Sequence, residues 1–267
     1  SQAGDTIATI AARLKNKGVI ENVNVQGYLE GRDHIAGLVN NIEGQSRVEN
    51  VSFKGQIKSK GGNSVTAGIA GTNAMSLVKR AYVEADIWVK SGQNAGMLVA
   101  QNFTNYSGAG WGNWGKLTQS VAKGKLEDAG SRNAAGIAAS IWPYGTINDT
   151  VSYATVVNGK ELFSSDNEIT DAWMGQKLQN LFGVQGQSSG TKTGKDAKFR
   201  RLTEAEAEQK VKSYQITALE QTSANEVTTE KLNAAILRTS TYQDKPGYKA
   251  ENEQLYQNLE RFIPFYN

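Results

Sequence analysis

Short runs in which apolar and polar residues alternate occur five times in the first 160 residues of the chain. The runs are VIENVNVQGYL at 19–29, RVENVSFKGQI at 47–57, LVKRAYVEADI at 77–87, KLTQSVAKGKL at 116–126 and TINDTVSYATV at 146–156. Alternation with a period of two is typical of β-strands whose two faces meet different surroundings. Each run therefore predicts a strand, and their recurrence predicts one strand built five times.

The aligned runs share columns of similar residues. A small column holds Gly27, Gly55, Ala85, Gly124 and Ala154; an apolar column two places later holds Leu29, Ile57, Ile87, Leu126 and Val156; an earlier apolar column holds Ile20, Val48, Val78, Leu117 and Ile147. Successive members of the small column lie 28, 30, 39 and 30 residues apart. A period near 30 indicates a repeated unit that buries its apolar face only against neighbouring copies.

A second element lies between the runs. It comprises HIAGLVNN, VTAGIAGTN, QNAGMLVAQN and RNAAGIAASI, aligned on Gly37, Gly68, Gly96 and Gly136, with a following column of Leu38, Ile69, Met97 and Ile137. A β-solenoid and a β-sandwich both fit two strands per unit, and the regular repeat favours the solenoid. We therefore expect a mainly β fold, a β-solenoid with a period of about 30, in which glycine marks a turn or a narrow interior.

The remaining segments predict helices and a linker. Residues 1–17 are expected to form a capping helix, because Ile7, Ile10 and Leu14 fall on one helical face. The solenoid is expected over 18–183, and the polar segment 184–201 is expected to be a linker or an exposed loop. Residues 202–267 are expected to be a small helical region, opened by a capping box of Thr203 and Glu206. This helical region could form a separate bundle or a cover docked on the coil, and the sequence fits both.

Composition excludes several kinds of chemistry. The chain has no cysteine and one histidine, so it cannot form a disulfide, a thiolate site or a zinc site that needs two histidines. A net charge of +3 is too small to indicate a nucleic acid partner. No apolar run reaches the roughly 18 residues of a membrane span. The single histidine, His34, is expected at a turn or a strand edge.

Aromatic residues in two loops are the candidate substrate contacts. The longest repeat spacing includes about ten extra residues, chiefly within NYSGAGWGNWGK, and the next repeat contains SIWPYGT. The candidate residues are Tyr106, Trp111, Trp114, Trp142 and Tyr144. Together they could form a ledge for sugar rings or for a proline-rich peptide. The alternative is that the tryptophans pack the loops onto the wall of the coil.

Longer stretches of the chain resemble a known family. Gly68-Ile69-Ala70-Gly71 is similar to the GLUG repeat of bacterial surface proteins. The stretches AGLVNNIEGQSRVENVSFKGQI, SLVKRAYVEADI, LTQSVAKGKL, AASIWPYGTI, VVNGKELF and IPFYN resemble the non-catalytic region upstream of the protease domain in streptococcal cell-surface zinc metalloproteases, the group that includes immunoglobulin A proteases. The resemblance covers the chain from about residue 18 to its end.

This resemblance implies a catalytic function for the parent protein and a non-catalytic one for this chain. The parent is expected to be a secreted hydrolase of the bacterial cell surface or cell wall, associated with virulence, whose zinc is held by an HExxH motif in a catalytic domain that this chain lacks. No catalytic residue, cofactor or metal is expected in this chain itself. Its expected role is that of a spacer and substrate-positioning module. Its expected partners are immunoglobulin A or another glycosylated, proline-rich protein, and the catalytic domain of the same polypeptide.

The sequence is also compatible with two other functions. A purely structural stalk or adhesin segment would bind no substrate. An autonomous polysaccharide-cleaving enzyme would need two carboxylates beside a glycosidic bond. Asp86, Glu127, Asp128 and Asp149 are available for that chemistry, but they form no recurrent acidic column.

Overall fold

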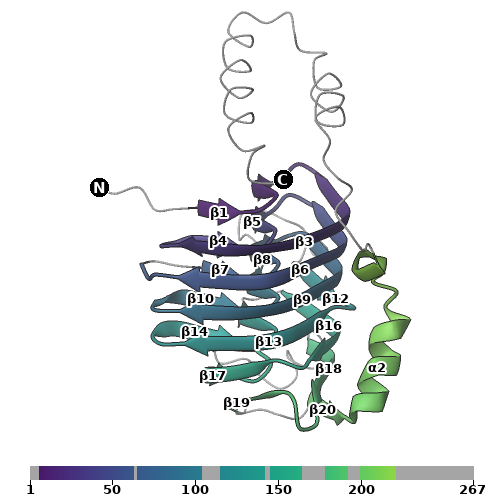
Figure 1. Cartoon of the computed structure of the whole chain (residues 1–267). Helices are drawn as coiled ribbons and strands as arrows, with labels where there is room; N and C mark the ends of the chain where they lie inside the picture. The colour runs from purple at the N-terminus through teal and green to yellow at the C-terminus, as the bar shows by residue number, and fades with distance from the viewer. Residues whose placement is uncertain are drawn as a thin grey trace, which may run out of the picture. The chain divides into compact units, whose positions relative to one another are not determined.

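The described part of the chain is a parallel β-solenoid of about five full turns (Figure 1). The structure, a computed structural model, describes residues 6–62, 65–103, 115–141, 145–163, 178–191 and 199–220. The chain divides into two units, Ser1–Gln221 and Thr222–Asn267, and all of the described residues belong to the first. The described strands pair in parallel, each with the equivalent strand of the next turn. The predicted mainly β, stacked fold is therefore confirmed.

Each turn contributes one long face and two short strands. The strands of the long face are β3 (Val19–Gly31), β6 (Arg47–Ser59), β9 (Leu77–Val89), β12 (Lys116–Thr118), β13 (Val121–Asp128), β16 (Thr146–Ser152), β17 (Thr155–Lys160), β18 (Leu178–Val184), β19 (Ser189–Thr191) and β20 (Phe199–Leu202). One row of short strands continues the same sheet: β1 (Thr6–Ala8), β4 (His34–Ala36), β7 (Val65–Ala67), β10 (Gly92–Gly96) and β14 (Ser131–Ala135). The other row forms a separate five-stranded sheet: β2 (Ala11–Leu14), β5 (Val39–Ile42), β8 (Ala70–Ala74), β11 (Val99–Phe103) and β15 (Ala138–Ile141).

The apolar columns of the sequence are stacks inside the coil. Leu29 pairs with Ile57, and the same column continues through Ile87, Leu126 and Val156. Ile57, Ile87 and Leu126 are at most 1% exposed. Complete burial of such a side chain contributes roughly 1.5–3 kcal/mol, so these columns supply much of the driving force for stacking. The prediction that equivalent residues lie over one another is confirmed.

A column of left-handed residues bends the long face. Its members are Asn22, Asn50, Arg80, Gln119, Asp149 and Asn180, with φ between 49° and 58°. Asparagine and aspartate tolerate this conformation better than most other residues with a side chain, and they hold four of the six positions. We call this column the corner column. It was not recognised in the sequence, because arginine and glutamine occupy the other two positions.

The small column includes three glycines, and the backbone requires only two of them. Gly55 and Gly124 have φ of +143° and +109°, and an added Cβ would lie 1.9 Å from the Gly27 carbonyl oxygen and 2.1 Å from that of Ala85, respectively. Only glycine fits at these two places. An added Cβ on Gly27, by contrast, would meet no atom within 4 Å. Gly27 lies on β3, where the long face has no further described strand beyond it.

The predicted N-terminal capping helix over residues 1–17 is wrong. Residues 6–14 form β1 and β2, which pair with β4 and β5. Ile7, Ala11 and Leu14 pack against the core as members of one more turn, whereas Ile10 is 42% exposed. Packing on the neighbouring turn therefore outweighs the helical spacing of these residues.

The third copy of the second element is shifted by one residue from its expected alignment. The Leu38 amide donates to the Ile69 carbonyl, and the Ile69 amide donates to the Leu98 carbonyl. Leu98, not Met97, therefore continues the apolar column, and Met97 lies against Gly68. An added Cβ on Gly96 would lie 2.1 Å from the Val99 oxygen, so this glycine serves a local turn. The shift by one residue places Leu98 and Val99 in the core.

The coil extends beyond its expected end at residue 183. β19 pairs with β17 and β20 pairs with β18, so strands occupy both ends of the segment expected to be a linker, while residues 192–198 lie outside the described ranges. A helix, α2 (Glu204–Ser213), follows and ends near a 3₁₀ turn, η1 (Thr217–Glu220). The predicted capping box is confirmed, because Thr203 N donates to Glu206 Oε2 at 2.8 Å and Glu206 N donates to Thr203 Oγ1 at 3.3 Å. The later helices expected around Leu232 and Leu255 lie outside the described residues.

Candidate functional site

The predicted aromatic ledge falls on loops that the structure does not describe. Tyr106, Trp111, Trp114, Trp142 and Tyr144 all lie outside the described residues, so the ledge stays a prediction. The described part of the coil instead has a groove on the outer surface of its long face. Two outward-facing columns determine the shape and chemistry of this surface.

The first outward column becomes apolar along the stack and is covered. It runs from Asn24 and Ser52 through Tyr82, Val121 and Val151 to Phe182. Residues 203–220, which we call the strap, include α2 and η1 and lie beside the coil (Figure 1). Tyr214, Ile216 and Ala218 of the strap join the apolar members of this column in one buried cluster. The strap thus acts as a second, external layer on the sheet.

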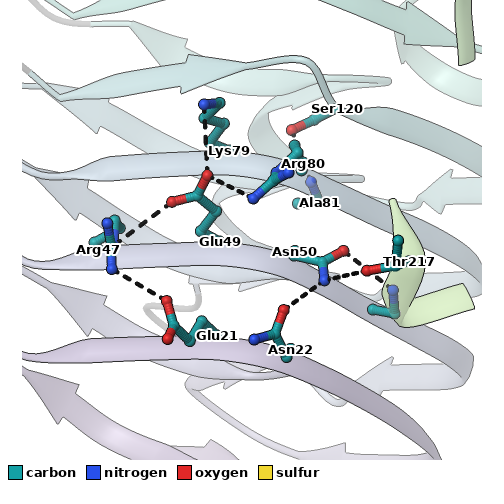
Figure 2. A network of polar contacts seen from close by, with 11 residues as sticks. Glu21, Asn22, Arg47, Glu49, Asn50, Lys79, Arg80, Ala81, Ser120 and Thr217 are labelled. Atoms are coloured by element: carbon teal, nitrogen blue, oxygen red, sulfur yellow. Dashed lines mark hydrogen bonds and ion pairs between the residues drawn. The ribbon is translucent and has the colours of Figure 1, made fainter. Parts of the chain in front are cut away.

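Polar contacts fix the strap to the corner column at two separate places. Asp149 Oδ1 lies 2.6 Å from Lys210 Nζ and accepts a hydrogen bond from the Tyr214 hydroxyl at 3.3 Å. Burial, followed by the charge of Asp149, raises the pKa of Tyr214. Asn50 Nδ2 donates to Thr217 Oγ1 at 2.7 Å and to Asn22 Oδ1 at 2.6 Å (Figure 2). The backbone amide of Ala218 donates to Asn50 Oδ1 at 3.1 Å.

Beside the corner column, a charge network links three turns of the coil. Glu49 lies 2.9 Å from Arg80, 3.4 Å from Lys79 and 3.6 Å from Arg47 (Figure 2). Arg47 also contacts Glu21 at 3.1 Å. Because every charged group here has a partner of opposite sign within the coil, this network is best explained as structural. The exposed pair of Arg47 and Glu21 contributes below about 1 kcal/mol.

The groove lies next to the covered column and stays open. Its volume is about 550 Å³, and its lining residues are Gly55, Glu84, Ala85, Asp86, Lys123, Gly124, Tyr153, Thr155, Gly186 and Gln187. Gly55, Ala85 and Gly124, from the small column, lie between outward-facing neighbours on either side. The lining crosses five levels of the stack, so the groove is about 19 Å long, given a spacing of ~4.8 Å between strands.

The wall nearest the strap is a second outward column of alternating charge. Glu84 lies 3.2 Å from Lys123 and 3.5 Å from Lys54, and it accepts a hydrogen bond from the Tyr82 hydroxyl at 3.0 Å. Burial acts to raise the pKa of Glu84, but the contacts with Lys123 and Tyr82 outweigh burial and hold it below its ordinary value. Glu84 is therefore ionised and held in place at neutral pH.

Two other lining groups form no hydrogen bond among the described residues. Neither the Asp86 carboxylate nor the Tyr153 hydroxyl forms a hydrogen bond within the described ranges. Tyr153 packs against the cluster under the strap, and burial, followed by the charges of Glu208 and Glu204, raises its pKa. Gln187 Nε2 donates to Glu204 at 2.7 Å, which positions this amide at the C-terminal end of the groove. The Asp86 carboxylate and the Tyr153 hydroxyl can therefore contact a ligand without breaking an existing hydrogen bond.

The chemistry of the groove favours binding over catalysis. Glu84 and Asp86 are two residues apart on β9 and so face the same side, as a glycosidase pair would. A glycosidase needs one of its carboxyls to have a raised pKa, and the contacts of Glu84 lower its pKa instead. Within the described ranges, no three acidic, histidine or cysteine side chains are grouped as metal ligands, and exposed His34 stands alone at the start of β4. The zinc implied by the resemblance does not fit these residues.

Two of the lining residues, Asp86 and Tyr153, could have been found in the sequence. They occupy the polar positions next to the small column, at the same places as Gln56 and Lys123 in neighbouring copies. The sequence pattern draws attention to the loop aromatics instead, and it offers Asp86 only as a candidate catalytic acid. No helix in the described ranges is both long and apolar enough to cross a bilayer.

Comparison with known proteins identifies a related segment in three streptococcal proteins. No protein-family model matches the chain. The chain is 37% identical over 265 residues to the zinc metalloprotease ZmpB of Streptococcus pneumoniae serotype 4, and 27% identical over 274 residues to the zinc metalloprotease ZmpC of the same organism. It is 24% identical over 282 residues to the immunoglobulin A1 protease of Streptococcus sanguinis.

The alignments cover 98–99% of this chain but only 13–14% of the length of each of the three proteins. The chain is therefore homologous to a segment of these zinc metalloproteases, and to that extent the expected resemblance is confirmed.

Proposed function

We propose that the chain is a non-catalytic β-solenoid module of a secreted, cell-wall-associated bacterial zinc metalloendopeptidase, and that it positions the substrate protein. The observation that supports this role is the open groove. Its wall is held in place by the neighbouring column that the strap covers. Similarity to one segment of three zinc metalloproteases supports the identity of the parent. The catalytic zinc would be bound in another part of that parent.

The dimensions of the coil favour positioning over a purely mechanical role. From β3 to β20 the long face stacks seven levels. Six spacings of ~4.8 Å give about 29 Å, which is roughly the diameter of a small domain. A stalk of this length adds little reach. A stalk also has no need for a groove with polar groups, such as Asp86 and Tyr153, that form no hydrogen bond within the described part of the chain.

The partner we propose is a glycosylated, proline-rich protein such as immunoglobulin A. One of the similar proteins is named as an immunoglobulin A1 protease. In this arrangement the catalytic domain of the same polypeptide would cleave a substrate that the coil holds outside the cell. The location would be the bacterial surface or cell wall.

The test compares two substrates of the full-length protease. Thr155→Arg places a long side chain in the groove, and Tyr28→Ala is the matched control on an exposed residue outside it. We expect Thr155→Arg to lower kcat/KM for intact immunoglobulin A1 by about tenfold, mainly through KM, because removed contacts of this kind contribute roughly 1–2 kcal/mol. Cleavage of a short peptide spanning the cleavage site should not change. If neither substitution changes kcat/KM for either substrate relative to the wild type, the coil acts as a stalk.

A further inference from the structure

The groove offers side chains to a ligand, but its floor strands offer no free backbone groups. Its floor strands are internal: β6 pairs with β3 and β9, and β13 pairs with β9 and β17. Their backbone N–H and C=O groups are therefore used in the parallel ladders. A polypeptide that binds a sheet by strand addition needs an open edge. The groove provides none, so an extended peptide would lose its main source of affinity there.

The charges around the groove balance. Glu84 faces Lys54 and Lys123, and Lys125 lies 2.6 Å from Glu127 and opposite Asp86 in the next turn. Three cations thus accompany three carboxylates along the two walls. A surface of this kind attracts neither a polyanion nor a polycation strongly. It suits a ligand without net charge that both donates and accepts hydrogen bonds.

The lining also provides a rigid aromatic platform. Tyr153 is half-buried against the cluster under the strap, so its ring is held by packing while its hydroxyl has no partner among the described residues. Gly55, Ala85 and Gly124 also line the groove, so its floor carries no bulky side chain at these three levels. An aromatic ring with a polar tip matches a sugar, which has an apolar face and a rim of hydroxyls.

We infer that this groove binds an oligosaccharide laid along the stack from Gly55 to Gln187. Tyr153 provides the stacking surface, and its hydroxyl, Asp86, Lys123 and Gln187 exchange hydrogen bonds with the sugar hydroxyls. The inference rests on the proposed function, because it names the chemical class of ligand that the positioning module holds. The sugar can be a glycan attached to a substrate protein or a free polysaccharide chain, since both present the same hydroxyls.

The experiment titrates the purified 267-residue chain with defined probes and measures affinity by calorimetry. The probes are the disaccharide galactosyl-N-acetylgalactosamine, as found on glycoproteins, the glucose polymer fragment cellotetraose, and an unglycosylated proline-rich peptide. We expect at least one of the two sugars to bind, and the sugar that binds indicates the source. Asp86→Ala and Tyr153→Phe should each weaken that binding by about tenfold, because each removes from the groove a group that hydrogen-bonds the sugar.

Tyr28→Phe is the matched control, since Tyr28 is 56% exposed and absent from the lining of the groove. Its affinity for the sugar should equal that of the wild type. Binding of the peptide but not of either sugar, with the peptide lost in the groove variants, would overturn the oligosaccharide assignment and leave the positioning role intact. Sugar binding that none of the variants changes would overturn the assignment of the groove. The same titration with intact immunoglobulin A1 separates the two claims. If immunoglobulin A1 binds while no sugar does, only the oligosaccharide assignment is overturned; if nothing binds, the positioning role is contradicted as well.

Discussion

Two neighbouring columns on the same outer surface differ in exposure: the strap covers one, and the other borders an open groove. The column of Tyr82, Val121, Val151 and Phe182 is apolar and is sealed by the strap. The adjacent column of Lys54, Glu84, Lys123 and Tyr153 lies two residues further along the same strands, is polar and borders an open groove. The backbone is the same in both. Side-chain chemistry within a column therefore decides whether this coil uses a surface for its own stability or leaves it for a ligand.

The two columns also depend on each other. The Tyr82 hydroxyl, from the sealed column, donates to Glu84 in the groove wall, and Tyr153 packs against the sealed cluster. The strap thus supports the groove without lining it. Substitutions under the strap should act mainly on stability, and substitutions in the groove mainly on binding.

The largest expected effect is on the sealed side. Tyr214→Ala removes an aromatic side chain that is 2% exposed and anchors the strap over the column. We expect a loss of about 3–5 kcal/mol in the free energy of unfolding, together with increased binding of a hydrophobic dye as the column becomes exposed. Chemical denaturation measures the first and fluorescence the second. Tyr28→Ala should leave both unchanged, and an equal loss from Tyr28→Ala would remove the distinction.

An intermediate effect is expected from the floor of the groove. In Gly55→Val the new Cβ meets the Gly27 carbonyl oxygen, and valine must adopt a φ of +143°. Overpacking and backbone strain together should cost about 2–4 kcal/mol. Gly27→Val is the matched control, because a Cβ on Gly27 meets nothing within 4 Å. If thermal unfolding shows the same loss for both variants, the stacking of these two glycines is not as described.

The smallest expected effect depends on pH and lies in the groove wall. The folded pKa of Glu84 is lowered, so its contribution to stability is complete above the ordinary pKa near 4.5 and is lost as the pH falls through the folded pKa. Because the side chain is 38% exposed, the contribution should stay below about 1 kcal/mol. The difference in unfolding free energy between wild type and Glu84→Gln should therefore shrink as the pH is lowered from 7 through this range.

Lys123→Met provides the control for this effect. It removes the nearest cation of Glu84, so the added substitution Glu84→Gln should then have a smaller pH-dependent effect than in the wild type. Denaturation curves of the four proteins at neutral and acidic pH measure this coupling directly. A difference between wild type and Glu84→Gln that grows toward acidic pH would show that Glu84 is destabilised by the fold.

The sequence predicts the coil well where a structural position requires the same type of side chain in every turn. The Leu29-to-Val156 column requires apolar side chains in every turn, and it was identified without error. The corner column was missed because its requirement is a backbone angle that Asn50 and Arg80 satisfy with different side chains. The register of Met97 was mistaken because Gly96 serves a local turn that resembles the stacked glycines of the other copies.

The candidate site was harder to predict than the fold. The groove depends on which outward column the strap covers, and that choice follows from contacts between residues far apart in the sequence, such as Asp149 and Tyr214. Helical spacing in residues 7–14 misled in the same way, because pairing with β4 and β5 decides their structure. Local pattern identifies the repeated unit, whereas the arrangement of the ends and the cover depends on tertiary packing.

Hydroxyl-radical footprinting of the chain with immunoglobulin A1 tests most directly whether the groove is the surface that holds a substrate. Tyr153 borders the groove and Tyr28 lies outside it, so the two tyrosines form an internal comparison within one sample. The account predicts that a saturating concentration of immunoglobulin A1 slows oxidation of Tyr153 and leaves that of Tyr28 unchanged. Unaltered oxidation of Tyr153, or protection of Tyr28 instead, would contradict it.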